Sequence, residues 1–329
     1  MSSRTVFRAA VLLTVSAVLI TASTAAAAAG GKGGEKAGDS KPSKVSLQLE
    51  GLKSGKLTAG EKATVVGTVR PFVKGSKVNV FLYRGKKTAK RVTIPVRPKG
   101  KGTGRFDFSK RLVKPGRYGF GAQFKKTAAV GGSKATTRRF HINYPDLGKG
   151  DSGPVVKVFN KLLADLGYVN DEGEAYDSAT GRAVLAWNKV NGNARKENSS
   201  SGMFKKLAKG KGGFKLKDPG QAGKHVEVDL SRQVMVLAKG DEVDEIYSVS
   251  TGASVTPTIL GKFNFYRKEP GTNSLGMVNS VYFQGGYATH GYASVPDYPA
   301  SHGCIRSPIP NSLHIYNWID IGDEIYVYH

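Results

Sequence analysis

The hydrophobic pattern of the chain changes its period twice, and these changes divide the sequence into segments. Between residues 44 and 145, apolar and polar residues alternate in short runs, a pattern that predicts strands with one buried face. Seven runs, separated by turns rich in Gly and Lys, predict an immunoglobulin-like β-sandwich. The runs are residues 45–49, 63–69, 78–83, 92–96, 105–108, 118–124 and 139–144.

A helical period replaces the alternation between residues 146 and 217. The first predicted helix carries one apolar stripe, formed by Val155, Phe159, Leu162 and Leu166. Asp151 and Ser152 are expected to cap this helix, with Pro154 in its first turn. Further helices are expected from about residue 177 and near residues 203–207, which together predict a small three-helix domain.

Strand-like alternation returns in the last segment, residues 224–329. Strands are predicted at residues 225–230, 233–237, 246–250 and 324–328, and a short helix ends near Trp318. We therefore expect a multidomain protein that ends in a mostly-β domain.

The N-terminal region has the pattern of a secretory signal peptide over residues 1–29. Arg4 and Arg8 precede a short apolar stretch, and residues 25–29 offer several cleavage sites between small residues. Residues 30–43 are rich in Gly, Lys and Ser and are expected to form a flexible linker. The mature protein is therefore expected to be secreted and extracytoplasmic, at the cell wall. Retention of the first segment as a membrane anchor is the alternative.

The charge is concentrated in one predicted domain. The chain has a formal net charge of +25, and residues 41–145 contain 26 Lys and Arg against three Asp and Glu. The last segment, residues 224–329, contains 7 basic and 11 acidic residues. An exported protein without a nucleic-acid-binding motif is not expected to bind nucleic acid. The basic domain, residues 44–145, is instead expected to bind anionic envelope polymers or lipid headgroups.

The only cysteine, Cys304, is the main candidate for chemistry. A single cysteine has no disulfide partner within the chain, and it lies near two histidines in the sequence, His290 and His302. A neighbouring imidazole would activate the thiol for acyl transfer, and Gly303 would allow a tight turn beside it. A buried structural cysteine and a zinc site formed with the two histidines are the alternatives.

Two parts of the sequence resemble known families. Residues 147–156, residues 166–168 and residues 176–184 resemble the peptidoglycan-binding domain of cell-wall enzymes, with Asn160 and Asn188 where Gln is usual. His290-Gly291, followed by Ser301-His302-Gly303-Cys304-Ile305-Arg306, resembles the signature of the L,D-transpeptidase family. The upstream residues 250–252, 256–258 and 261–263 also resemble segments of that family. The second resemblance covers residues 224–329 and implies a β-rich catalytic fold with an active-site cysteine.

The resemblance also implies a role for each residue of the motif. Cys304 would be the nucleophile, and His290 would be the general base and acid; His302 as the base is the alternative. The remaining candidates would orient His290, shape the turn that stabilises an oxyanion, or bind a substrate carboxylate. They are Gly291, Ser301, His302, Gly303 and Arg306.

The expected function is that of an exported L,D-transpeptidase that cross-links peptidoglycan stem peptides through an acyl-enzyme. Its partners would be the donor and acceptor stems of peptidoglycan, and no metal or other cofactor is expected. Two alternatives are an L,D-carboxypeptidase, in which water resolves the same intermediate, and a wall-binding protein without catalysis.

Overall fold

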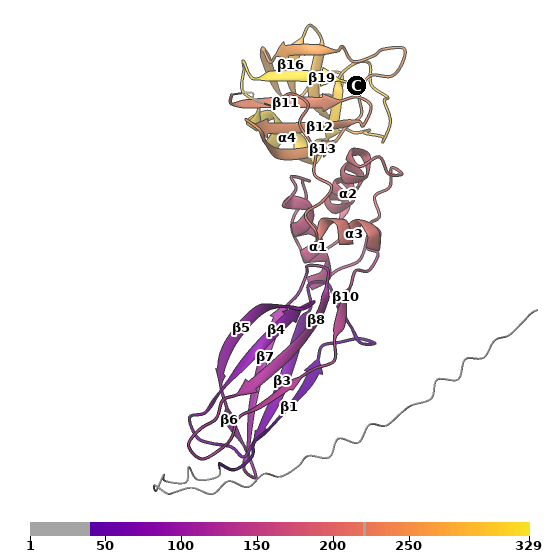
Figure 1. Cartoon of the computed structure of the whole chain (residues 1–329). Coiled ribbons are helices and arrows are strands. Elements are labelled where there is room, and N and C mark those ends of the chain that lie inside the picture. Colours follow the sequence, from indigo (N-terminus) through magenta and orange to yellow (C-terminus); the bar gives the residue numbers. More distant parts are fainter. Residues whose placement is uncertain (1–39, 220–221) are drawn as a thin grey trace, which may run out of the picture. The chain divides into compact units, whose positions relative to one another are not determined.

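The computed structural model describes residues 40–219 and 222–329, and over these residues the protein is mostly β with four α-helices (Figure 1). The predicted signal peptide and most of the predicted linker lie outside the described residues. Residues 40–43, expected in the linker, are already attached to the first β-domain. The amide of Gly131 donates to the carbonyl of Lys41 at 2.9 Å. Among the described residues, no helix combines the length and apolar character needed to span a bilayer.

The first domain consists of two sheets around a shared apolar core that includes Val65, Phe106 and Phe120. One sheet has the order β1 (Lys44–Glu50), β3 (Lys62–Arg70), β7 (Thr103–Arg111) and β6 (Arg97–Gly100). The other has the order β2 (Lys56–Thr58), β10 (Phe140–Asn143), β8 (Arg117–Phe124), β4 (Lys77–Arg84) and β5 (Lys87–Pro95), with β9 (Ser133–Thr136) paired to β8.

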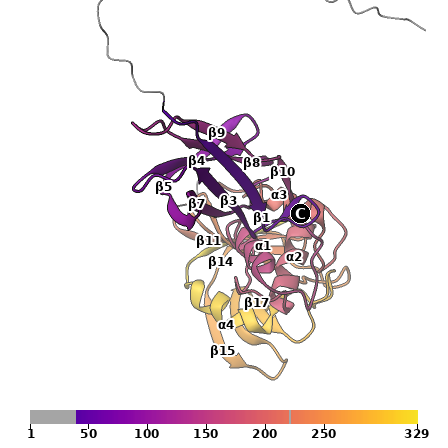
Figure 2. The same ribbon diagram turned by 90° about the horizontal axis from the view of Figure 1, so that it is seen from below.

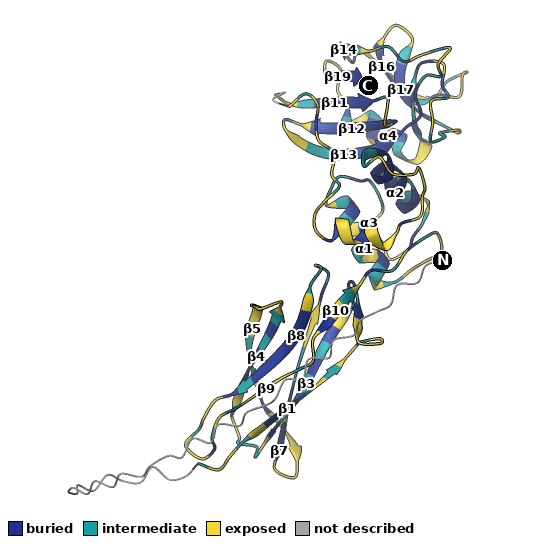
Figure 3. Ribbon diagram, turned by 45° about the vertical axis from the view of Figure 1, so that its right-hand side comes forward, coloured by how far each residue is buried: buried dark blue, intermediate teal, exposed yellow. Residues whose placement is uncertain are grey.

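All seven predicted runs of this domain correspond to strands, and three further strands were not predicted. Strand β3 shows why the prediction succeeds, because its buried residues alternate strictly with less buried ones (Figure 3). Strands β2, β6 and β9 are only three or four residues long, and every residue of β6 is exposed. Strand β6 has no buried face and so no hydrophobic alternation, and β2 and β9 are too short for an alternation to be recognised.

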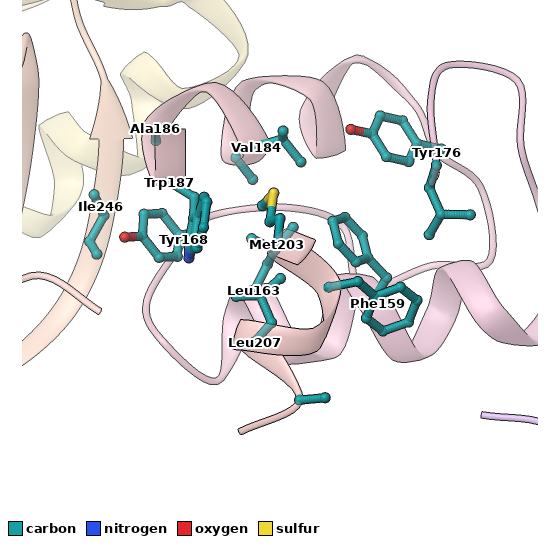
Figure 4. Packing of buried hydrophobic residues seen from close by; sticks show 14 of the residues in the cluster. Phe159, Leu163, Tyr168, Tyr176, Val184, Ala186, Trp187, Met203, Leu207 and Ile246 are labelled. Carbon is teal, nitrogen blue, oxygen red and sulfur yellow. The ribbon is translucent and has the colours of Figure 1, made fainter. Parts of the chain in front are cut away.

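Helices α1 (Pro154–Ala164), α2 (Ser178–Val190) and α3 (Ser201–Leu207) occur where the helical period was found. Their inner faces meet in a core that includes Phe159, Leu163 and Trp187 (Figure 4). Phe159 packs edge-on against Phe204, with the ring centroids 5.1 Å apart. The buried face of α1 is formed by Val156, Phe159, Asn160 and Leu163. Of the predicted stripe, only Phe159 is fully buried, and Val155, Leu162 and Leu166 are partly buried at the edge of the core.

The predicted cap of α1 is wrong, whereas the start of α2 is as expected. Gly153, with φ 99°, occupies the N-cap of α1 and provides no side chain. The carboxylate of Asp151 instead accepts the amide of Gly148 at 2.8 Å and closes a turn before the helix. Asp177 caps α2 by accepting the amide of Thr180 at 2.8 Å.

The last domain has two sheets and one helix. One sheet has the order β13 (Glu242–Ser248), β12 (Val234–Lys239), β11 (Lys224–Asp229), β19 (Glu324–Tyr328) and β14 (Gly261–Asn264). The other has the order β15 (Arg267–Thr272), β16 (Val278–Gln284), β17 (Tyr287–Tyr292) and β18 (Ile305–Pro308). Helix α4 (Ile309–Trp318) lies against β16 and β17. Figure 2 shows it beside β17.

Helix α2 is joined to the last domain by a buried lysine. The side chain of Lys189 is 3% exposed, and its ammonium donates to the carbonyls of Gln233 and Val249 and to Ser248 Oγ at 2.8–3.2 Å. The backbone amide of Ile246 also donates to the carbonyl of Gly167 at 2.7 Å. These contacts attach the helical segment to the strands and loop beside the candidate active site.

Candidate active site

Two neighbouring parallel strands bring Cys304 and His290 together at one face of a sheet. Strands β17 and β18 pair so that Thr289 faces Ile305 and His290 faces Arg306. Cys304 immediately precedes β18, so it aligns with Ala288. Because side chains alternate between faces, Cys304 and Arg306 share their face with Ala288 and His290. Two residues 14 positions apart in the sequence are thus placed on the same face of neighbouring strands by strand pairing.

His290 is held in a defined orientation. Its side chain is buried, and its Nδ1 lies 2.9 Å from the carbonyl oxygen of Gly291. Since a carbonyl only accepts, Nδ1 carries the proton of the neutral ring and Nε2 is left with a lone pair. The ring of Tyr292 packs edge-on against the imidazole, with the centroids 5.7 Å apart. Burial lowers the pKa of His290, and the nearby Arg306 guanidinium adds to this effect.

Cys304 is partly buried and contacts an apolar cluster formed by Met277, Tyr282 and Ala288. Its Sγ lies 3.5 Å from the carbonyl oxygen of Gly286. Burial raises the pKa of the thiol, although the Ala288 amide and the Arg306 guanidinium favour the thiolate. Both shifts favour the uncharged forms, the thiol of Cys304 and the imidazole of His290.

The turn before Cys304 is fixed by hydrogen bonds from a hydroxyl group inside it. Ser301 is buried, and its Oγ donates to the carbonyl of Cys304 at 2.5 Å and accepts the amide of Gly303 at 3.1 Å. Gly303 has φ 114°, and a Cβ at this position would lie 2.7 Å from the ring of Tyr287. Glycine is therefore required here by both backbone conformation and space.

A second loop braces this turn from the other side. Thr258 Oγ1 donates to the carbonyl of Gly303 at 2.8 Å and accepts the amide of Gly252 at 2.9 Å. The amide of Ser301 donates to the carbonyl of Thr251 at 2.9 Å, and Thr251 itself is bonded on two sides by the amide group of Gln233. The family resemblance includes Thr251 and Thr258 but gives neither a role, because each acts through contacts between distant segments.

Arg306 and His302 occupy different environments. The guanidinium of Arg306 lies 4.1 Å from the centroid of the Tyr292 ring, so Tyr292 contacts both His290 and Arg306. The side chain of His302 is exposed and is not joined to His290 by any hydrogen bond that the described residues form. Over the same residues, no group of three or more His, Cys, Asp or Glu side chains gathers as a metal site would require.

The comparisons with known proteins agree with this architecture. The family model described as the L,D-transpeptidase catalytic domain (YkuD) matches residues 223–327. The crystal structure of an L,D-transpeptidase from Xylanimonas cellulosilytica is 30% identical, with a TM-score of 0.51, and the match covers 56% of this chain and 98% of that chain. The comparison with curated proteins gave no match.

Two other solved structures are more distant. An L,D-transpeptidase from Stackebrandtia nassauensis is 22% identical over 57% of this chain and 97% of that chain, with a TM-score of 0.36. The catalytic domain of the L,D-transpeptidase from E. faecium is 24% identical over 33% of this chain and 98% of that chain, with a TM-score of 0.29. The family match and the 30% identical structure carry the conclusion: this chain belongs to the L,D-transpeptidase family, with its catalytic domain at residues 223–327.

Proposed function

We propose that the protein cross-links peptidoglycan stem peptides outside the cell through an acyl-enzyme on Cys304. The observation that carries this proposal is the pairing of β17 with β18, which puts Cys304 and His290 on one sheet face with Nδ1 of His290 bonded to Gly291. The family supplies the class of substrate, and the site supplies a nucleophile, a base and a fixed turn.

In the proposed first step, Nε2 of His290 accepts the proton of the Cys304 thiol as Sγ attacks the carbonyl carbon of the donor stem. The S–C bond forms, and the carbonyl π electrons move to the oxygen. When the tetrahedral intermediate collapses, the C–N bond breaks and the protonated His290 returns the proton to the leaving amine. A thioester between Cys304 and the shortened donor remains.

In the second step, the amine of an acceptor stem attacks the thioester. His290 accepts a proton from that amine, the C–S bond breaks, and the new amide joins the two stems. Cys304 then regains its proton. The directions of the two pKa shifts suit this order of steps, because a thiol and an imidazole that both favour the uncharged form transfer the proton during attack rather than before it.

The other candidate residues divide into supporting and substrate-facing groups. Ser301 and Gly303 fix the turn, and the amide of Gly303 already donates a hydrogen bond to Ser301 Oγ. We therefore assign Ser301 and Gly303 to holding Cys304 in place rather than to binding an oxyanion. Arg306, stacked on Tyr292, is the residue we assign to a substrate carboxylate, since guanidinium groups match carboxylate geometry.

The remaining domains complete the proposal. We propose that residues 146–217 form a peptidoglycan-binding domain, as their sequence resemblance implies, and that residues 44–145 form an immunoglobulin-like basic domain facing the envelope. Export by a cleaved signal peptide would place all three domains at the cell wall, where the substrate is.

The test is incubation of the mature protein with a disaccharide-tetrapeptide, followed by mass spectrometry of the products. Cross-linked dimers are expected, and they must disappear in Cys304→Ala and His290→Ala. His302→Ala is the matched control, because it removes the exposed histidine of the same motif. Tripeptide without dimer would refute the transferase, and full activity in Cys304→Ala would refute the nucleophile.

A further inference from the structure

A cavity lined by basic and hydroxyl side chains lies on the outer face of the β1-β3-β7-β6 sheet, in the first domain. Its volume is about 630 Å³, and we call it the basic cavity. The cations that line it come from β1, β3 and the β6–β7 hairpin, and they are Lys44, Arg70, Lys99 and Lys101. The hydroxyl groups of Ser46, Thr68 and Thr103 line the space between them.

The arrangement of these cations is unfavourable for the isolated domain. Lys44 on β1 faces Arg70 on β3 directly in the strand register, and like charges in facing positions destabilise a sheet. Lys101 adopts φ 48° in the turn between β6 and β7, a conformation that glycine adopts more easily. A bound anion would offset the repulsion between these cations. The fold alone gives no reason to place the cations together.

No carboxylate compensates these charges from within the cavity. The first domain has three acidic residues in the described region from residue 41 to residue 145, and none of them lines the cavity. Glu61 lies 3.8 Å from Lys53, and Asp107 lies 2.5 Å from Arg97. Glu50 is at the other end of β1, about 20 Å from Lys44 along the strand.

We propose that the basic cavity binds the phosphodiester groups of an anionic polymer of the cell envelope. Three of its four cations are ammonium groups, which bind phosphate as point charges. The Nε of Arg70 is already bonded to Thr103 Oγ1 at 2.6 Å, so one edge of the guanidinium fork is unavailable for bidentate carboxylate binding. The hydroxyl groups supply further donors to phosphate oxygens.

A polymer fits the surface better than a lipid membrane does. The cavity is concave, and the net positive charge of the domain continues beyond it, so a chain of repeated charges is attracted along its length. Among the described residues, every large hydrophobic side chain that is strongly exposed lies in the last domain, from Val255 to Ile321. The basic domain thus presents no apolar anchor for insertion between lipids.

The proposal rests on the proposed extracytoplasmic function, and its experiment is separable from that function. The mature protein is titrated into fluorescein-labelled oligo(glycerol phosphate), and binding is followed by anisotropy at several salt concentrations. The cavity variant K44Q/K99Q/K101Q is compared with K86Q/K87Q/K90Q, which removes three exposed lysines of the same domain from the β4–β5 hairpin. Circular dichroism establishes that both variants fold.

We expect the cavity variant to bind about tenfold more weakly, and the control variant less than about threefold more weakly. The slope of log Kd against log salt should fall by about two to three in the cavity variant alone. Equal losses in the two variants would overturn the cavity as the site. Equal binding of oligogalacturonate of matched charge would overturn the phosphodiester class, and tighter binding to phosphatidylglycerol vesicles would overturn the polymer.

Activity on a soluble disaccharide-tetrapeptide is measured with the same variants. Both should keep full activity, because neither set of lysines lies near Cys304. If binding behaves as expected while no variant or parent forms dimers, the proposed function fails and the cavity stands. If dimers form while the cavity variant binds normally, the cavity fails and the proposed function stands.

Discussion

The burial of Lys189 predicts how the free energy of unfolding depends on pH, and the size of the effect follows from its lowered pKa. The ammonium group lies between three neutral acceptors of the last domain, and burial lowers its pKa from 10.5 to about 7. Burial is the largest cause of this lowered pKa, Arg195 contributes in the same direction, and Asp297 acts in the opposite direction. Between these two pKa values the unfolded chain binds a proton that the folded protein does not bind.

The sign of the effect follows from this difference in bound protons. Stability rises with pH wherever the unfolded state binds more protons. Lys189 therefore adds about 1.4 kcal/mol to the free energy of unfolding per pH unit above about pH 7, and about 5 kcal/mol by the time pH reaches the unfolded pKa. Below about pH 7 both states are protonated, and this lysine contributes no slope.

The assay is urea unfolding of the parent and Lys189→Met at a series of pH values from about 7 to about 10, in reductant to protect Cys304. Tryptophan fluorescence is a suitable probe, because the two tryptophans, Trp187 and Trp318, lie in the helical segment and the last domain. The difference in unfolding free energy between parent and variant should grow by about 4 kcal/mol over this range.

The matched control is Lys205→Met, which removes an exposed lysine of α3 and should leave the pH slope of the parent unchanged. If the difference in unfolding free energy between the parent and Lys189→Met stays constant across this pH range, Lys189 is not buried as described. The contact between α2 and the strands beside the active site would then be wrong as well.

The remaining predictions concern the site itself. The rate of Cys304 alkylation by iodoacetamide should keep rising above neutral pH, because burial raises the pKa of the thiol; a rate that is flat from acidic to alkaline pH would show a preformed thiolate. Gly303→Ala should lower dimer formation at least about a hundredfold and destabilise the fold by about 1–3 kcal/mol, since Cβ would strike Tyr287 at φ 114°; wild-type kinetics would refute this strain. Thr258→Val removes the hydrogen bonds of the hydroxyl group to the Gly303 carbonyl and from the Gly252 amide, and should lower kcat about tenfold. Thr258→Ser keeps the hydroxyl group and should retain the activity of the parent. Equal activity of the two variants would refute the role of these bonds in holding the turn.

Much of the fold could be predicted because burial on one face leaves a periodic trace in the sequence. Strand β3 buries every second residue, as its alternation predicts. Helix α1 was also predicted from its period, but its buried face shares only Phe159 with the predicted stripe. Strand β6 left no such trace, because all its residues are exposed. The predicted cap of α1 is wrong because Gly153 occupies the N-cap, while the Asp151 carboxylate accepts the amide of Gly148 before the helix.

The candidate site was predictable only as far as its residues are adjacent in the sequence. The motif around Cys304 identified the residues of the turn, but their roles in catalysis remain predictions. The supporting roles of Thr258, Gln233 and Lys189 were not predicted, because the sequence of a polar residue does not show whether it faces water or braces a buried turn. Tyr292 was missed for a similar reason, since its contacts with His290 and Arg306 arise from strand pairing.

The central claim is that catalysis proceeds through a thioester on Cys304. The most direct measurement is an acid quench of the protein during turnover of a disaccharide-tetrapeptide, followed by proteolysis and mass spectrometry of the peptide that contains Cys304. We predict an adduct on Cys304 with the mass of the disaccharide-tripeptide acyl group, absent in Cys304→Ala. Turnover with unmodified Cys304, or an adduct on any other residue, would contradict the account.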